Sequence, residues 1–230
     1  MERADFDLSR LKDKPIEMRL ELCLDACLSL NSLHKLSIAH RDIKPSNYLV
    51  FKENHQLTVK LSDFGCARLY NDASSEEGMT VTGAIGSGNY RSPEVLFPTY
   101  QGEDFRCQDI WSFCLLLLEL LFDFPVESRP FSMLIPIINR EKRDITFSDL
   151  NRVMDQGLNL KLFDGGEILF GLILQGLRYH VKNRIANLDL LQKYLIQYRG
   201  YQKKFCRFKN SQFRFELQLL AEVDNIADVF

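Results

Sequence analysis

The chain has 230 residues, a formal net charge of −2, and apolar and charged fractions of 46% and 26%. This length fits one domain that can bury a sizeable core, and the composition is that of a globular protein. A net charge so close to zero provides no broad attraction to nucleic acid or to a membrane surface, so neither is expected as a partner. Six cysteines lack metal-site or disulfide-framework spacing, so we expect reduced thiols and a cytoplasmic location.

The first third of the chain contains one helix signal and two strand signals. Residues 16–35 include neither Gly nor Pro, and their apolar residues recur at helical spacing, which predicts one long amphipathic helix. A proline disfavours helix in the loop of residues 40–47. Two β-prone runs, 48–51 and 57–61, flank a turn at 52–56 and therefore predict a β-hairpin.

The rest of the chain predicts a polar loop followed mostly by helices. Residues 71–89 are rich in Asn, Asp, Ser, Glu, Thr and Gly, which is typical of a loop. The apolar run Phe113–Phe122 is interrupted by Glu119 and is too short to span a bilayer, so it predicts a helix buried on all sides. Helices are expected to begin near Asp109, Ser148, Gly166 and Asn187. Residues 212–223 fit either strand or helix.

Side chains suited to chemistry lie at both ends of the predicted hairpin. The run HRDIKPSN, residues 40–47, precedes the hairpin, and the run VKLSDFG ends at Gly65 just after it. Antiparallel strands would bring Asn47 and Asp63 to adjacent ends, so that these two residues could share one metal ion. Carboxylate and amide oxygens are ligands that Mg²⁺ accepts.

These two motifs are followed in order by SPE at 92–94 and DIWS at 109–112, and the whole set resembles the catalytic core of the protein kinase family. The resemblance covers residues 1–200. It implies a mainly α fold like the family's large C-terminal lobe, with a small two-stranded β-hairpin that carries the catalytic loop and the DFG motif. Residues 201–230 are expected to form an extension that packs on this lobe or trails from it.

Protein kinases also bind ATP with a small N-terminal lobe, which carries a Gly-rich loop and a strand lysine. No G-x-G-x-x-G or V-A-I-K run precedes Asp42 in this chain. The opening segment MERADFDLSRL resembles the end of the family's hinge and the helix after it. We therefore expect the chain to start near the hinge and the N-lobe to be absent.

The resemblance implies a role for each residue around the hairpin. Asp42 would orient a substrate hydroxyl and accept its proton, and Lys44, typical of serine/threonine kinases, would damp charge on the transferring phosphate. Asn47 and Asp63 would hold Mg²⁺ against the phosphates of ATP. Leu49 would lie under the adenine ring.

The residue before the catalytic aspartate, Arg41, resembles that of kinases regulated by phosphorylation of the following loop. Phosphate on that loop would neutralise the arginine. Thr80 and Thr82 are the first candidate acceptors, with Ser74 and Ser75 less favoured. An alternative is that all of them are ordinary loop hydroxyls.

Other motif residues are implied to be structural. His40 and Phe64 would belong to a hydrophobic column, Gly65 completes the DFG motif, and Ser87 would bond the catalytic aspartate and lysine. In a second set, Glu94 would pair with Arg184, and Asp109 would hold the backbone of the catalytic turn. One residue departs from the family pattern, because Cys114 stands where glycine is usual; we expect a local packing change there.

Two functions remain open from the sequence. The first is a serine/threonine protein kinase that uses ATP and Mg²⁺ on protein substrates, with impaired activity because an N-lobe is missing. The second is a non-catalytic binding or regulatory module, with an N-lobe or a regulatory protein supplied by another chain. A nucleotide hydrolase of another fold is disfavoured because no G-x-x-x-x-G-K-[ST] run is present.

Overall fold

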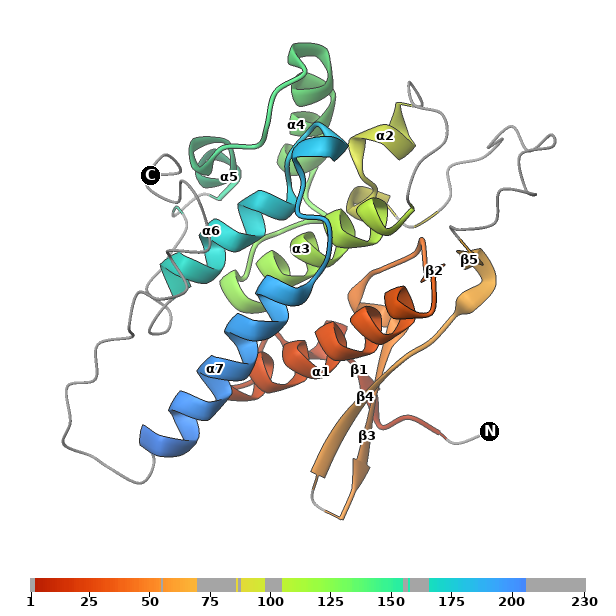
Figure 1. The fold of residues 1–230 in the computed structure, drawn as a ribbon. Coiled ribbons are helices and arrows are strands. Elements are labelled where there is room, and N and C mark those ends of the chain that lie inside the picture. Colours follow the sequence, from red (N-terminus) through yellow and green to blue (C-terminus); the bar gives the residue numbers. More distant parts are fainter. Residues whose placement is uncertain are drawn as a thin grey trace.

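The computed structural model describes residues 3–54, 56–69, 86, 88–97, 105–154, 157 and 166–205. Most of this part is helical, which confirms the predicted mainly α fold (Figure 1). The helices are α1 (Ile16–Lys35), α2 (Pro93–Leu96), α3 (Arg106–Phe122), α4 (Arg129–Glu141), α5 (Phe147–Val153), α6 (Gly166–Gly176) and α7 (Asp189–Phe205). The strands are β1 (Phe6–Asp7), β2 (Ile38–Ala39), β3 (Tyr48–Glu53), β4 (Gln56–Leu61) and β5 (Arg68–Leu69).

Helix α3 is the centre of the core. Every residue from Asp109 to Phe122 except Glu119 is buried, so the prediction of a helix buried on all sides is confirmed. Helices α1 and α6 pack against α3, and α7 packs against both of them (Figure 1). Each fully buried leucine or phenylalanine on α3 contributes roughly 1.5–3 kcal/mol of transfer free energy. The core is therefore built around the helix that begins beside the catalytic loop.

The departure from the family pattern at Cys114 is matched by a glycine on the facing helix. A Cβ atom placed on Gly176 of α6 would lie only 2.1 Å from Cys114 Sγ. The sulfur thus occupies the space that the missing side chain of Gly176 leaves open. The local packing change expected at Cys114 is therefore found as a close contact with Gly176, the small residue on α6.

Helix α1 matches its predicted range of 16–35 and joins the core to α7 through a polar contact. The buried side chain of Asn31 donates hydrogen bonds to Asp189 Oδ1 at 3.0 Å and to Gln192 Oε1 at 2.6 Å. Both acceptors lie on α7, which continues to Phe205. That helix crosses residue 200, where the sequence places a domain boundary.

The small sheet corrects one prediction. Strands β3 and β4 form the expected antiparallel hairpin, with Tyr48 opposite Leu61. However, β1 pairs with β3, so the sheet has three strands instead of two. A strand of two residues is too short to show an alternating pattern, which is why the sequence did not reveal it. A second small sheet pairs β2 with β5.

The opening segment also differs from a regular helix. After β1 the chain makes a single 3-10 turn, Leu8–Leu11, in which both leucines are fully buried. Asp7 caps this turn by accepting a hydrogen bond from the backbone N–H of Ser9 at 2.9 Å. The segment therefore anchors the start of the chain against the hairpin and the core.

Several predicted features lie outside the described residues: Ser74, Ser75, Thr80, Thr82, Ser87 and the ambiguous stretch 212–223. Among the described residues, no disulfide joins any two of the five cysteines. None of the described helices combines the length and the hydropathy that crossing a membrane requires.

Candidate active site

The catalytic loop is held in place by one buried carboxylate at the start of α3. Asp109 Oδ1 accepts a hydrogen bond from the backbone N–H of Arg41 at 2.7 Å, and Oδ2 accepts one from the backbone N–H of His40 at 2.7 Å. The ring nitrogen Nε2 of His34 contacts the same Oδ2 at 2.8 Å. Arg41 has a positive φ of 70°, a conformation that costs energy for a residue with a side chain. The Asp109 carboxylate therefore supports a strained turn just before Asp42.

Three predicted site residues lie together after this turn. The carboxylate of Asp42 is nearly buried, and its Oδ2 lies 2.9 Å from Lys44 Nζ. Asn47 Nδ2 donates hydrogen bonds to the backbone oxygen of Asp42 at 2.7 Å and to Asp42 Oδ2 at 3.1 Å. Because the amide nitrogen of Asn47 is used in this way, its oxygen is the atom that can act as a metal ligand.

The hairpin register brings Asp63 to the same end of the sheet. The backbone N–H of Ser62 donates to the backbone oxygen of Asn47 at 2.8 Å, and Ser62 Oγ donates to the same oxygen at 2.9 Å. Asp63 follows with a left-handed φ of 60° and an exposed carboxylate. A Cβ on Gly65 would lie 3.3 Å from Asp63 Oδ1, so the glycine of the motif leaves room for this carboxylate.

The two motifs also touch through their aromatic rings. The rings of His40 and Phe64 lie 5.1 Å apart in an edge-to-face arrangement, and His40 Nε2 contacts the backbone oxygen of Ser62 at 2.9 Å. The Phe64 ring is nevertheless 50% exposed. Leu49, on β3, is half-buried. Phe64 and Leu49 therefore offer accessible apolar surface for further contacts.

The donors at this site fit Mg²⁺. Asp63 offers a carboxylate and Asn47 an amide oxygen, and Mg²⁺ is commonly held by one or two such protein ligands together with phosphate oxygens and water. Among the described residues, no three His, Cys, Asp or Glu side chains are grouped to form an all-protein metal cage. A nucleotide phosphate is the kind of ligand that would complete the coordination.

The arginine of the catalytic loop lies near the positive charge of Arg68 and the negative charge of Asp109. Burial lowers the pKa of Arg41, and the nearby charge of Arg68 lowers it further. The Arg41 guanidinium carbon stacks over the Phe105 ring at 4.8 Å, and within the described residues its buried Nε has no hydrogen-bond partner. This environment suits an anion.

The structure brings Glu94 and Arg184 together. Arg184 donates from Nη1 to Glu94 Oε1 at 2.7 Å and from Nη2 to Oε2 at 3.1 Å. The same buried guanidinium donates to the backbone oxygens of Cys107 and Arg178, and it lies 5.1 Å from the Trp111 ring centroid. This cluster fixes α2 against the start of α3.

Sequence reasoning missed two residues of the site. His34 supports Asp109, and its position one turn beyond Asn31 on the buried face of α1 was the available signal. Gly86 has a φ of 87°, and a Cβ there would lie 2.9 Å from the backbone oxygen of Arg41. Gly86 lines a small cavity beside Asp42 together with Arg91.

Comparison with known proteins agrees with this geometry. The family model described as "Protein kinase domain" matches residues 10–194. The chain is 36% identical over 120 residues to the serine/threonine-protein kinase Genghis Khan of Drosophila melanogaster, an alignment that covers 50% of this chain and 7% of that protein. It is 37% identical over 116 residues to the serine/threonine-protein kinase PknB of Mycolicibacterium smegmatis, which covers 49% of this chain and 17% of the relative.

A longer alignment is found with calcium-dependent protein kinase 3 of Plasmodium yoelii yoelii, with 29% identity over 161 residues, or 67% of this chain and 28% of that protein. The alignments therefore span less than a third of the length of each of these relatives. The chain belongs to the protein kinase family, and two of these relatives are serine/threonine-protein kinases.

Proposed function

We propose that this chain carries the catalytic centre for phosphoryl transfer from Mg-ATP to a serine or threonine hydroxyl of a protein. Asp42 positions the acceptor hydroxyl and takes its proton as the new phosphate ester forms. Lys44, whose ammonium lies 2.9 Å from Asp42 Oδ2, is placed to balance negative charge on the transferring phosphate. The observation that carries the proposal is the convergence of Asp42, Lys44 and Asn47 on one another at the base of the hairpin.

The same proposal assigns the cofactor contacts. Asn47 and Asp63 hold the metal ion, and Leu49 contacts the adenine base of ATP. Bound Mg²⁺ supplies charge neutralisation at the terminal phosphates and aligns them for in-line transfer. The hydrogen bonds from Asn47 Nδ2 to Asp42 turn the Asn47 oxygen toward this role. Arg41 serves as the anchor for phosphate on the following loop, with Thr80 and Thr82 as acceptors and Ser87 as a bridge between Asp42 and Lys44.

We further propose that the 230-residue polypeptide, assayed by itself, transfers phosphate weakly. Its sequence supplies no Gly-rich loop and no strand lysine ahead of Asp42, and both groups hold nucleotide phosphates in line. A displacement of reacting groups by about 1 Å can lower a rate by roughly a hundredfold. A polypeptide without these two groups is therefore expected to align the nucleotide phosphates less precisely.

A second function, as a binding or regulatory module, is favoured by one specific observation. Three large apolar side chains near the catalytic loop are exposed: Leu36 by 68%, Leu69 by 55% and Phe64 by 50%. Leu36 follows α1, and Leu69 lies on β5, opposite Ile38 of β2. Such a surface suits contact with another folded unit, for example a kinase N-lobe provided in cis or in trans.

The test is incorporation of labelled phosphate into a generic basic protein, with the wild-type polypeptide compared to Asp42→Asn and Asp63→Ala. We expect low incorporation that falls to background in both variants. High incorporation that survives both substitutions would refute the site assignment. High incorporation that both substitutions abolish would instead refute the proposed impairment and leave the site intact.

A further inference from the structure

A second cavity, of about 270 Å³, lies beside α2 and shares no lining residue with the small cavity beside Asp42. Its walls come from three segments that are distant in sequence. Pro93, Glu94 and Phe97 come from α2 and its end, Lys142 comes from the end of α4, and residues 179–182 come from the connection between α6 and α7. The apolar part of the wall is formed by Pro93, Phe97, Tyr179 and Val181, and the polar part includes Lys142, His180 and Lys182.

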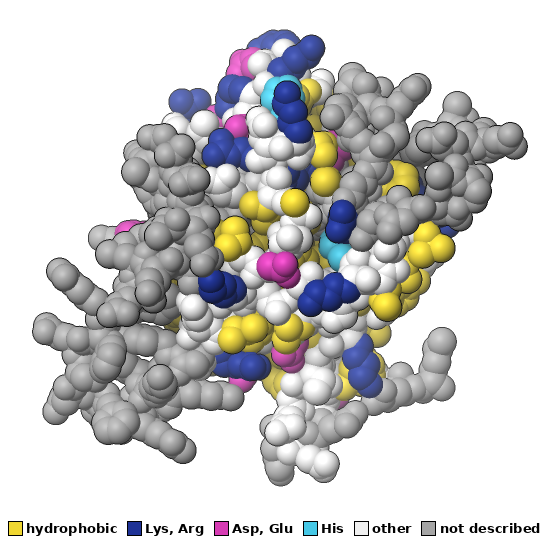
Figure 2. Space-filling model, viewed as in Figure 1, with side chains coloured by type: hydrophobic (Ala, Val, Ile, Leu, Met, Phe, Trp, Pro, Cys, Tyr) yellow, Lys and Arg dark blue, Asp and Glu magenta, His cyan; other side chains and the backbone are white. Residues whose placement is uncertain are grey.

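The cations of this cavity lack acidic partners. Among the described residues, neither Lys142 nor Lys182 forms an ion pair, and both side chains are exposed. The one acidic residue in the wall, Glu94, is bound by both terminal nitrogens of Arg184. The charge that the cavity offers to a ligand is therefore positive. Figure 2 shows Lys and Arg side chains gathered around a histidine at the top of the molecule, where α4 and the α6–α7 connection lie in Figure 1.

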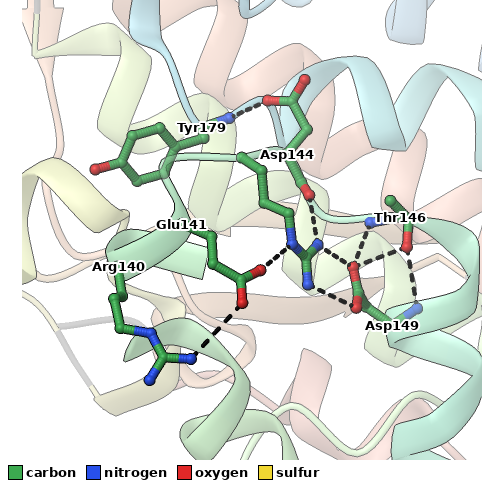
Figure 3. Close-up of polar contacts among 7 residues, drawn as sticks. Arg140, Glu141, Asp144, Thr146, Asp149 and Tyr179 are labelled. Carbon is green, nitrogen blue, oxygen red and sulfur yellow. Dashed lines mark hydrogen bonds and ion pairs between the residues drawn. The ribbon is translucent and has the colours of Figure 1, made fainter. Parts of the chain in front are cut away.

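The acidic residues next to Lys142 are committed to other cations. Glu141 Oε2 lies 2.6 Å from Arg143 Nε, and Asp144 Oδ2 lies 2.8 Å from Arg178 Nη1. Asp149 accepts hydrogen bonds from the remaining nitrogens of Arg143 at 2.6 and 3.1 Å. Figure 3 shows how this network ties the end of α4 to the start of α5. Among the described residues, Lys142 forms no ion pair with any of these three carboxylates.

The same network supports the backbone of the cavity wall. The backbone N–H of Tyr179 donates to Asp144 Oδ1 at 2.6 Å (Figure 3). The Tyr179 hydroxyl donates to Asn139 Oδ1 at 2.9 Å. The ring of His180 packs edge-to-face on the ring of Tyr179, with centroids 5.0 Å apart. Lys142 itself is fixed as the left-handed residue that ends α4, with a φ of 51°. The backbone positions that carry these cations are thus fixed by contacts that do not depend on a ligand.

We propose that this cavity binds a phosphoserine or phosphothreonine side chain, together with a neighbouring apolar residue, in a segment of the protein substrate. A phosphate dianion matches two lysines and a histidine better than a single carboxylate does, because it brings more charge and three acceptor oxygens. The apolar wall suits the neighbouring residue. This proposal rests on the proposed kinase function only for the identity of the occupant.

The geometry of α2 links the cavity to the catalytic centre. Val95 of α2 and Ser92, the residue before this helix, line the small cavity beside Asp42, while Glu94 of α2 and Phe97, the residue after the helix, line the second cavity. A helix is roughly 10–12 Å across with its side chains, and an extended chain covers roughly 3.3–3.6 Å per residue. An extended substrate that reaches both cavities therefore carries its phosphate at least about three to four residues from the acceptor hydroxyl.

The test is fluorescence anisotropy with three short fluorescein-labelled peptides that share one sequence containing a phenylalanine. They carry phosphoserine, glutamate or serine at one position. Lys182→Ala removes one charge, and Lys142→Asn removes the other while asparagine tolerates the left-handed backbone there. Lys35→Ala, at the exposed end of α1, is the control with an equal change in charge. Asp63→Ala separates this site from the nucleotide site.

We expect the phosphoserine peptide to bind at least about tenfold more tightly than the serine peptide, since charge-assisted hydrogen bonds are lost without the phosphate. Lys142→Asn and Lys182→Ala should each weaken its binding about tenfold, whereas Lys35→Ala and Asp63→Ala should leave it unchanged. Undiminished binding to both cavity variants, or no binding to the wild type, would overturn the proposal. Equal binding of the glutamate peptide would overturn the assignment to phosphate. None of these outcomes bears on phosphate transfer at Asp42.

Discussion

The contact between α3 and α6 predicts that the effect of Gly176→Ala on the free energy of unfolding depends on residue 114. The substitution should not stabilise the wild type, but it should stabilise a Cys114→Ala variant. Gly176→Ala adds a Cβ atom 2.1 Å from Cys114 Sγ, far inside van der Waals contact, in a core where the cysteine is fully buried. Overpacking of this kind costs about 1–3 kcal/mol. Alanine in place of glycine favours the helix by up to about 1 kcal/mol. In the wild-type background, Gly176→Ala should therefore be neutral to destabilising by about 2 kcal/mol.

The Cys114→Ala background removes the obstruction. The Cβ that remains at position 114 lies 3.4 Å from the new Cβ, and Ile110 Cγ2 lies 3.5 Å from it. Here Gly176→Ala should stabilise the protein by about 0.5–1 kcal/mol through helix propensity alone. Urea denaturation of the four proteins of this cycle gives the coupling free energy, expected at about 1–3 kcal/mol. A coupling near zero, or the same sign for Gly176→Ala in both backgrounds, would refute the packing argument.

Three further substitutions test the supporting contacts. Asp109→Asn should cost about 3 kcal/mol of unfolding free energy in urea and reduce phosphate transfer, because at least one of three donors to a buried carboxylate loses its acceptor; unchanged stability would contradict this. Arg184→Ala should cost about 3 kcal/mol by leaving the partly buried carboxylate of Glu94 unpaired, and a urea midpoint like that of the wild type would argue against it. Burial opposes ionisation of Asp149, but hydrogen bonds from Arg143 and Thr146 outweigh it and lower the pKa of Asp149. Its contribution to stability is therefore present above the unfolded pKa and lost as the pH falls through the folded pKa, so Asp149→Asn should flatten acid unfolding curves below about pH 4.

The sequence predicted the elements that have a long, regular pattern. Helix α1 and the buried helix α3 were found because apolar residues repeat at helical spacing or run without a break. The hairpin was found from two β-prone runs, although its strands extend to Glu53 and from Gln56, which makes the turn shorter than the predicted 52–56. Strand β1 was not predicted because it has only two residues, both paired with β3, and so shows no alternating pattern.

The sequence predicted those residues of the candidate site that lie within the two motifs, but not the contacts between distant segments that support them. The motifs identified Asp42, Asn47 and Asp63, since each of them lies within a recognisable run of residues. The support of Asp109 by His34 was missed because it joins residues 75 positions apart on two helices. The second cavity could not be predicted at all, because its walls come from three separate segments that meet only in the folded chain.

The central claim is that Asn47 and Asp63 hold the metal of a Mg-nucleotide complex beside Asp42. The most direct measurement is anisotropy of a fluorescent ATP analogue, titrated with the polypeptide in the presence of Mg²⁺ and again with EDTA. The account predicts binding that requires Mg²⁺ and that Asp63→Ala weakens by about tenfold or more, since a carboxylate ligand is lost. Nucleotide binding that is equally strong in EDTA and unchanged in Asp63→Ala would contradict it.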